Sequence, residues 1–226
     1  MNYEIKGGEL PVVELHLESG ESINCENGAM SWMTDNMQMQ TKGNGIGKMF
    51  SKAMTGEKMF SNTYVANNGP GMITMCTNFP GSIIAIEIGP GREIVCQKGA
   101  YLASTPGVDM SIFFQKKIGA GFFGGEGFIM QRMSGTGMVF LEIDGTAIEY
   151  QLEAGQRMII DTGYLAMMDA SCKMDIETVK GGIKNMVLGG EGFFNTVVTG
   201  PGKIILQTMP KVQLASAIGS FLVTSR

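Results

Sequence analysis

The 226-residue chain has few of the residues that enzymes and metal sites use most. It contains a single histidine, His16, and a single tryptophan, Trp32. One histidine argues against a multi-histidine metal site and against triads built on histidine. The four cysteines form no Cys-x-x-Cys pair, so neither a zinc ribbon nor a dithiol redox motif is indicated. No secretory leader pattern follows Met1, and we therefore expect reduced thiols and a cytoplasmic location.

Charge and long apolar runs are also scarce. Charged residues make up 17% of the chain and the formal net charge is −4, which gives no electrostatic reason to expect binding to nucleic acid. No run approaches the roughly 18 apolar residues needed to cross a bilayer. Nucleic acid is therefore an unfavoured partner.

Glycine and apolar residues are abundant. The chain has 33 glycines and 44% hydrophobic residues. Short apolar runs separated by many turns favour a β architecture with a substantial core. We expect an all-β fold.

The glycines recur with a period of about 65 residues. Gly-x-Gly turns begin at residues 69, 135 and 200, which are steps of 66 and 65 residues. A second pair of glycines, eight residues apart, recurs earlier in each copy: Gly20 and Gly28, Gly91 and Gly99, Gly155 and Gly163. This pattern predicts three internal repeats of sheet-forming units, arranged as one pseudo-threefold body.

The repeat also predicts the organisation of the chain. We expect β repeats over 1–80, 81–144 and 145–209, which share one core because no linker-like segment separates them. Residues 210–226 then form a short C-terminal helix, since apolar residues over Val212 to Val223 follow helical spacing. Such a helix is expected to pack on its own sheet or on a neighbouring subunit.

Each repeat starts with an alternating strand. In the first copy Val13, Leu15 and Leu17 alternate with polar residues, which predicts a strand over Pro11 to Glu18 with one wet face. The same alternation places these residues on the buried face in the other two copies: Ile84, Ile86 and Ile88, and Ile148, Tyr150 and Leu152.

Two sets of residues that contain glutamates are candidate metal sites. Glu14, His16 and Glu18 share one strand face, but the repeat aligns His16 with Glu87 and Gln151, so a solvated polar face is the favoured interpretation. Glu57, Glu126 and Glu191 recur once per copy. They could converge to hold a hard cation such as calcium, although turn acids that accept backbone N–H bonds are favoured.

The remaining candidates also favour structural roles. Cys25, Cys96 and Ile160 align, which marks an apolar core position and not a thiolate site. Cys76 and Cys172 have no histidine nearby in sequence. The glycines of Gly43-x-Gly45-x-Gly47 lack the spacing of a phosphate-binding loop. We therefore predict no catalytic, cofactor-binding or metal-binding residues.

Apolar residues at loop-like positions indicate a partner surface. Phe122-Phe123, Phe193-Phe194, Met49-Phe50 and the tail helix carry much apolar surface, and exposed apolar patches are typical of interaction sites. Self-association as a homo-oligomer, with a trimer favoured, is the main expectation. Contact with a membrane or another protein is the weaker alternative.

The glycine motifs carry a family resemblance. Gly28-Ala29-Met30, the Gly-Arg-Glu-Ile run at Gly91, and the Gly-Glu stretches that lead to Gly-Pro-Gly turns at Gly69 and Gly200 resemble bacterial relatives of the "altered inheritance of mitochondria protein 24" family. The resemblance implies a double-stranded β-helix fold, grouped with the tryptophan RNA-binding attenuation protein. It further implies bacterial members of unknown function, eukaryotic members linked to mitochondrial inner-membrane organisation, and no established catalytic residues.

Together these patterns predict a non-enzymatic scaffold or interaction protein that self-associates through sheet edges and apolar loops. The alternative is a binding module for a small molecule or nucleic acid, which rests on the fold-level analogy alone.

Overall fold

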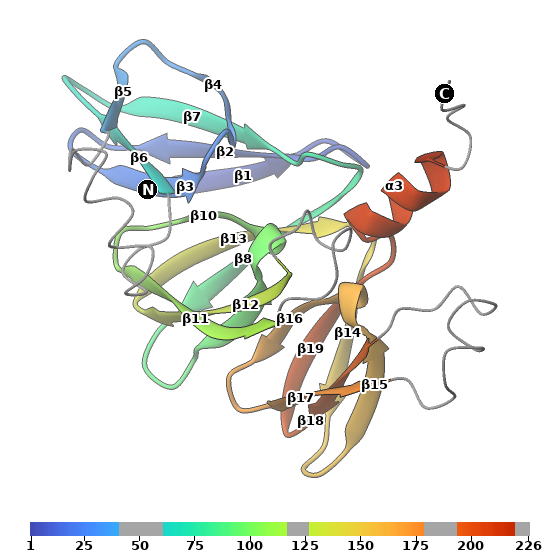
Figure 1. Cartoon of the computed structure of the whole chain (residues 1–226). Coiled ribbons are helices and arrows are strands. Elements are labelled where there is room, and N and C mark those ends of the chain that lie inside the picture. Colours follow the sequence, from blue (N-terminus) through green and yellow to red (C-terminus); the bar gives the residue numbers. More distant parts are fainter. Residues whose placement is uncertain (41–60, 117–126, 179–193, 220–226) are drawn as a thin grey trace, which may run out of the picture.

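A computed structural model describes residues 1–40, 61–116, 127–178 and 194–219. Apart from two short 3-10 turns and one C-terminal helix, the described elements are β-strands, so the all-β prediction is confirmed. Figure 1 shows them as three consecutive groups, one below the other, from the N-terminal strands at the top to the last strands at the bottom.

The first group contains seven strands. They are β1 (Asn2–Lys6), β2 (Val12–Leu17), β3 (Ser22–Glu26), β4 (Met30–Met33), β5 (Met37–Gln40), β6 (Ser61–Ala66) and β7 (Gly71–Cys76). In β2 the predicted alternation is realised, because Val13, Leu15 and Leu17 are buried.

The next two groups contain six strands each. The second has β8 (Gly81–Ile88), β9 (Ile94–Gln97), β10 (Tyr101–Ser104), β11 (Val108–Lys116), β12 (Phe128–Gly135) and β13 (Gly137–Asp144). The third has β14 (Ala147–Leu152), β15 (Arg157–Asp161), β16 (Leu165–Asp169), β17 (Lys173–Thr178), β18 (Phe194–Thr199) and β19 (Gly202–Gln207). The 3-10 turns η1 (Lys98–Ala100) and η3 (Thr162–Tyr164) precede β10 and β16.

Within each group the antiparallel pairings follow one scheme. The last strand lies between two others, so that β7 pairs with β2 and β4, β13 with β8 and β10, and β19 with β14 and β16. The strand before it does the same, so that β6 pairs with β3 and β5, β12 with β9 and β11, and β18 with β15 and β17.

Two further pairings connect the groups. Strand β3 pairs with β10, and β9 pairs with β16, so each of these two pairings builds a six-stranded sheet from two groups. We call these two pairings the internal junctions. The four-stranded sheet that remains at the start has β4 at its edge, and the three-stranded sheet at the end has β15 at its edge.

Three hydrophobic clusters fill the spaces between these sheets. The first includes Leu15 together with Leu102 and Phe140 of the next group. The second packs Ile86 and Leu141 against residues of the third group that include Met167 and Ile205. The third combines residues of the second and third groups, among them Val95, Phe128, Leu165 and Ile204. Each cluster therefore binds neighbouring groups into one body.

The Gly-x-Gly turns lie immediately before the last strand of each group, as the sequence predicted. The backbone at both Gly137 and Gly202 has φ near +149°, and a Cβ at either residue would collide with Thr105 or Cys172. Glycine is required there because it alone combines this conformation with the absent side chain.

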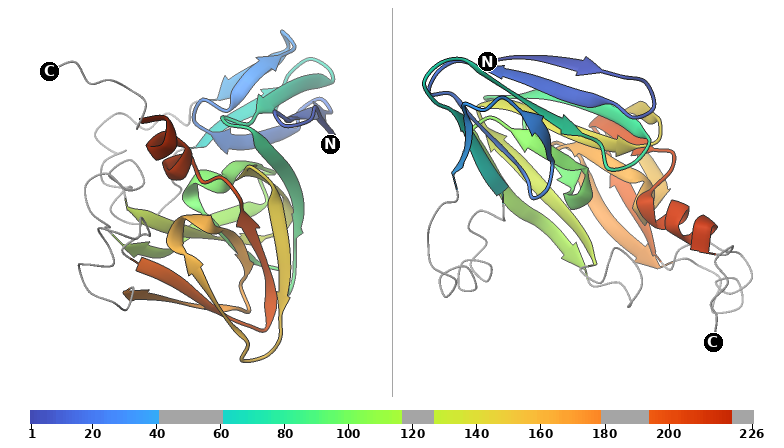
Figure 2. Two further views of the ribbon diagram at one scale, coloured as in Figure 1. Left: turned by 90° about the vertical axis from the view of Figure 1, so that its right-hand side faces the viewer. Right: turned by 90° about the horizontal axis from the view of Figure 1, so that it is seen from above.

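One expectation about buried faces was wrong. In β14 only Leu152 is buried, whereas Ile148 and Tyr150 are 37% and 44% exposed, because none of the other described strands covers this face. The C-terminal helix α3 (Lys211–Gly219) is confirmed, and Ala217 and Ile218 on its predicted apolar face are exposed within the single chain. Figure 2 shows α3 lying at the outside of the strands.

Candidate functional site

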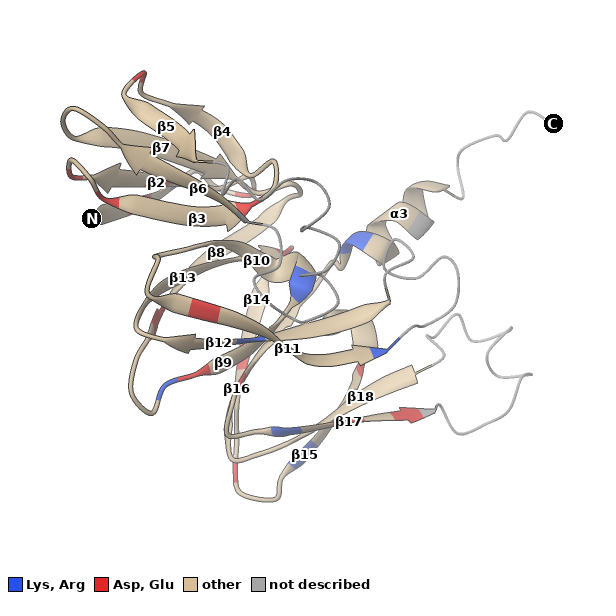
Figure 3. Cartoon of the chain, turned by 60° about the vertical axis from the view of Figure 1, so that its left-hand side comes forward, with Lys and Arg blue, Asp and Glu red and all other residues tan. Residues whose placement is uncertain are grey.

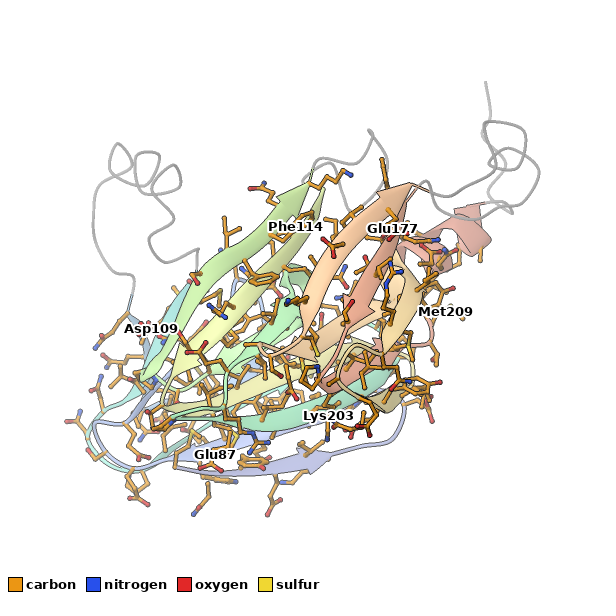
Figure 4. The ribbon with its side chains drawn as sticks, turned by 90° about the horizontal axis from the view of Figure 1, so that it is seen from below. Glu87, Asp109, Phe114, Glu177, Lys203 and Met209 are labelled. Atoms are coloured by element: carbon orange, nitrogen blue, oxygen red, sulfur yellow. The ribbon has the colours of Figure 1, made fainter. Side chains whose placement is uncertain are left out.

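His16 lies on the outer face of β2, as the repeat alignment predicted. Its Nε2 is 3.0 Å from Glu14 Oε1, and the same carboxylate accepts a hydrogen bond from Lys6 Nζ. The aligned residue Glu87 is also exposed, and Figure 4 shows its side chain pointing outward at the rim of the molecule. The position is a solvated polar face.

The aligned cysteines are buried. Cys25 and Cys96 are fully inaccessible and belong to the first two hydrophobic clusters, and Ile160 belongs to the third. Burial raises the pKa of both thiols to about 12, because the charged thiolate loses its solvation. The predicted core role of these positions is confirmed.

Most of the other predicted sites lie outside the residues that the structure describes. Glu57, Glu126 and Glu191, the Gly43–Gly47 stretch, Met49-Phe50, Phe122-Phe123 and Phe193 all lie outside the described residues. Within the described parts of the chain, no group of three or more His, Cys, Asp or Glu side chains is placed to hold a metal ion. Phe194 packs against the third cluster, and Lys116 Nζ lies 4.2 Å above its ring centre.

One charged cluster is buried beneath the start of α3. Lys211 Nζ contacts the carboxylate of Glu142, which is only 2% exposed, and lies 3.7 Å from Asp144 Oδ1. Burial alone would lower the pKa of Lys211, but the two carboxylates outweigh it and raise that pKa above its usual value. Burial raises the pKa of Asp144, although Lys211 opposes the shift. The cluster fastens α3 to β13.

A cavity of about 480 Å³ opens beside this cluster. Its lining includes Glu26, Lys98, Asp144, Gln207 and Lys211. Gln207 is held in place, because its Nε2 donates to Gln97 Oε1 at 3.2 Å and to the Gly163 carbonyl at 2.8 Å. The mixed charges of the lining are compatible with a small polar ligand.

Most of the residues at the internal junctions are buried. At the first, Cys25 pairs with Ala103 and Asn24 with Ser104. At the second, Cys96 pairs with Met167 and Val95 with Met168. These residues on β10 and β16 are at most 3% exposed, whereas Asn24 and Asp169, which pairs with Ile94, are partly exposed.

The strands at the two ends of the series have no such neighbour among the described strands. Strands β4 and β15 are edge strands, and both Figures 1 and 3 place them at opposite ends of the molecule. We call these two edges the free ends. On β4, Trp32 is 48% exposed and Met33 is 37% exposed, and on β15 Ile159 is 64% exposed. The free ends therefore present large apolar side chains to solvent.

The sequence did not point to these residues. Strand β4 carries no alternation that marks it, and in the repeat only Ile160, the neighbour of Ile159, aligns with the cysteines. The same alignment makes Ile159 the equivalent of Val95, which is buried.

Charge does not mark any single face. Figure 3 shows Lys and Arg interspersed with Asp and Glu along the strands, and several ion pairs, among them Arg157 with Glu177 and Lys203 with Glu149, are exposed. Such pairs contribute little to stability. In the described parts of the chain, no helix has the length and apolar character needed to cross a membrane.

Comparisons with known proteins agree with the sequence resemblance. The family model described as "Mitochondrial biogenesis AIM24" matches residues 3–209. An uncharacterised protein of Streptococcus pyogenes serotype M6 is 30% identical over 227 aligned residues, which cover 96% of this chain and 89% of that protein. A crystal structure of a Streptococcus pyogenes protein from a structural genomics project is similar with a TM-score of 0.82 and 27% identity, over 98% of this chain and 99% of the other.

Proposed function

This chain belongs to the mitochondrial biogenesis AIM24 family, and on that premise we propose that it is a non-enzymatic scaffold or interaction protein that works by self-association through its sheet edges. The observation that carries the proposal is the apolar character of the free ends, where Trp32, Met33 and Ile159 are exposed. Natural proteins protect edge strands because unpaired N–H and C=O groups recruit other strands. Edges that are apolar instead indicate a partner.

The proposal includes three copies of one unit, over 1–80, 81–144 and 145–209, as double-stranded β-helix elements. Its support is that the same pairing scheme occurs in each group. A bulge also interrupts the equivalent ladder in each, after Met30, Tyr101 and Leu165.

An equivalent side-chain hydrogen bond in each of the three groups supports the alignment of the copies. Thr34 Oγ1 accepts from Met72 N at 3.0 Å, Thr105 Oγ1 from Met138 N at 2.9 Å, and Asp169 Oδ2 from Lys203 N at 2.7 Å. These pairs occupy equivalent positions, so Trp32 corresponds to Ala103 and Met167. A closed pseudo-threefold body would pair β15 with β4 inside one chain, and among the described strands this pairing is absent. The series of copies is open at both ends.

Sedimentation equilibrium over a range of protein concentrations tests the proposed function. We expect a mass well above the 24.2 kDa of one chain, with a trimer as the favoured closed form. A single species of one chain mass, at concentrations up to several milligrams per millilitre, would contradict self-association.

The cavity beside Lys211 favours a second candidate function, the binding of a small polar molecule. Its volume falls within the range of ligand pockets, and Gln207 and Lys211 give it fixed polar groups. Thermal shift against a panel of charged metabolites tests this. A ligand that stabilises the wild type but not the Lys98→Ala variant supports it, and no shift with any compound counts against it.

A further inference from the structure

The two free ends match one another as the two sides of an internal junction do. An internal junction pairs the second strand of one group with a short strand of the following group, as in β3 with β10 and β9 with β16. The third group has such a second strand, β15, and the first group has the corresponding short strand, β4. Among the described strands, neither of them is paired in this way, and each lies at the edge of its sheet.

We infer that β15 of one chain pairs in antiparallel fashion with β4 of a second copy, which joins copies head to tail. This rests on the proposed self-association and names its partner and its register. The internal junctions set that register, because Ile160 occupies the place of Cys96 and Trp32 the place of Met167. Trp32 of the second copy then lies opposite Ile160, Met33 opposite Ile159, and Thr34 opposite Met158.

Burial at the equivalent positions supports the pairing. Val95 and Met168, which meet at the second junction, are both fully buried. Their counterparts at the free ends, Ile159 and Met33, are 64% and 37% exposed. The free ends therefore retain the apolar residues of a junction while lacking its neighbour.

A second surface at the same end gives the contact more area. Leu15 and Ile86 are buried where the next group covers them, and the equivalent Tyr150 on β14 is 44% exposed. A second copy that docks on β15 takes the place of a next group and covers this face as well. The pairing of one short strand alone is small, so this added area matters for a stable contact.

The charges on the strands also agree. Strand β4 carries no charged residue, and the central residues of β15 are Met158, Ile159 and Ile160. Two other edge strands carry charge, β1 with Glu4 and Lys6 and β17 with three charged residues. Edge strand β5 also lacks charge, so the repeat alignment, and not the charge alone, selects β4 and β15 as partners.

The arrangement is heterologous, since different surfaces of each copy meet. Such contacts close into a ring when the rotation between copies allows it and otherwise grow as a filament. A two-fold dimer would instead use the same surface twice. This difference gives the contact a distinctive test.

The experiment uses Met33→Lys and Ile159→Lys, each of which places a charge at one free end. Alone, either variant can form only the disrupted contact, and we expect each to sediment at one chain mass. In a mixture, the intact β15 of the Met33→Lys protein meets the intact β4 of the Ile159→Lys protein. We expect a one-to-one dimer that does not grow further, because lysines occupy both remaining ends.

Leu10→Lys is the matched control, since Leu10 is 63% exposed but lies at neither free end; it should assemble as the wild type does. Circular dichroism melts establish that each variant is folded. Dimer formation in the mixture gives direct evidence that both lysine variants are folded, because each must provide an intact strand edge.

The outcomes separate the two proposals. A monomeric wild type overturns the proposed function and this inference with it. An assembled wild type whose two variants remain assembled overturns the inference alone. Two monomeric variants that form no dimer when mixed overturn the head-to-tail pairing.

Discussion

The internal junctions and the free ends use equivalent strands in opposite environments. At the second junction, Met167 and Met168 of β16 lie against β9 and are buried. At the N-terminal free end, Trp32 and Met33 occupy the same positions on β4 and face solvent. At these two positions, burial follows the presence of a paired neighbouring strand and not the apolar character of the residue. The predictions below change particular residues and, where the chain offers one, use an equivalent position in a different environment as the control.

The largest effect is expected from a charge placed within a junction. Met167→Lys buries an unpaired ammonium group and should lower the free energy of unfolding by at least about 4 kcal/mol. Trp32→Lys, at the equivalent position of the free end, should change it by no more than about 0.5 kcal/mol in the monomer. Urea titration followed by circular dichroism measures both. Equal losses in the two variants would show that the positions are not in different environments.

A smaller loss is expected when the buried charge pair beneath α3 is broken. Lys211→Met leaves Glu142 buried without its cation and should cost about 3 kcal/mol at neutral pH. The equivalent place at the second junction holds the neutral pair Gln207 and Gln97. Gln207→Met should therefore cost less, about 1 kcal/mol. Unfolding free energies of the two variants at pH 7 give the comparison.

The charged cluster of Lys211, Glu142 and Asp144 also predicts that stability depends on pH. Because the folded pKa of Lys211 is raised above 10.5, its contribution to stability is complete below that pH and is lost as the pH rises through the folded value. The folded pKa of Asp144 is raised above its unfolded value of 3.8. Stability therefore falls as the pH rises from the unfolded pKa of this carboxyl to its folded pKa. The deficit of Lys211→Met should shrink both on acidification and at high alkaline pH. A deficit independent of pH would contradict the assigned charges.

Truncation of an apolar side chain should also distinguish a covered face from an open one. Ile86→Ala removes methyl groups from the second hydrophobic cluster and should cost about 2 to 3 kcal/mol. Tyr150→Ala, at the equivalent position on β14, should cost less than about 1 kcal/mol because this side chain is already 44% exposed. Chemical denaturation of dilute, monomeric protein measures the difference. A larger loss in Tyr150→Ala would mean that its face is already covered within one chain.

The smallest effect concerns accessibility and leaves stability unchanged. A thiol introduced by Ile159→Cys should react quickly with a maleimide in dilute protein, and more slowly where the chain is assembled. A thiol introduced by Val95→Cys, at the equivalent place inside a junction, should react only on unfolding. Mass spectrometry follows both rates. Rapid labelling at residue 95 would place the junction in the wrong register.

The sequence predicted those features that depend on local pattern. The alternation in β2 foretold its buried face, and the aligned glycines foretold the turns that precede β7, β13 and β19. The core positions of Cys25 and Cys96 also followed, because the eight-residue glycine spacing aligned them with Ile160.

It did not predict features that depend on distant neighbours. Ile148 and Tyr150 alternate as Val13 and Leu15 do, yet they are exposed, because a strand's own pattern does not report whether another group lies across from it. Strand β4 was missed since its four residues, Met-Ser-Trp-Met, show no clear period. The candidate site at the free ends became visible only when pairing partners more than sixty residues apart were known.

The most direct test of head-to-tail pairing is disulfide formation at a single predicted contact. In a Cys76→Ser background, the double variant Met33→Cys/Ile159→Cys places one thiol at each free end. Facing residues in adjacent strands have Cα atoms about 4.5 to 5.5 Å apart, which suits a disulfide. The control Met33→Cys/Arg157→Cys moves one thiol two residues along β15, beyond the reach of a disulfide. We predict that mild oxidation converts the first variant into covalent multimers of the 24.2 kDa chain on non-reducing gels, while the control remains a single chain. Equal cross-linking of both variants, or of neither in a protein shown to be assembled, would contradict the pairing of β15 with β4.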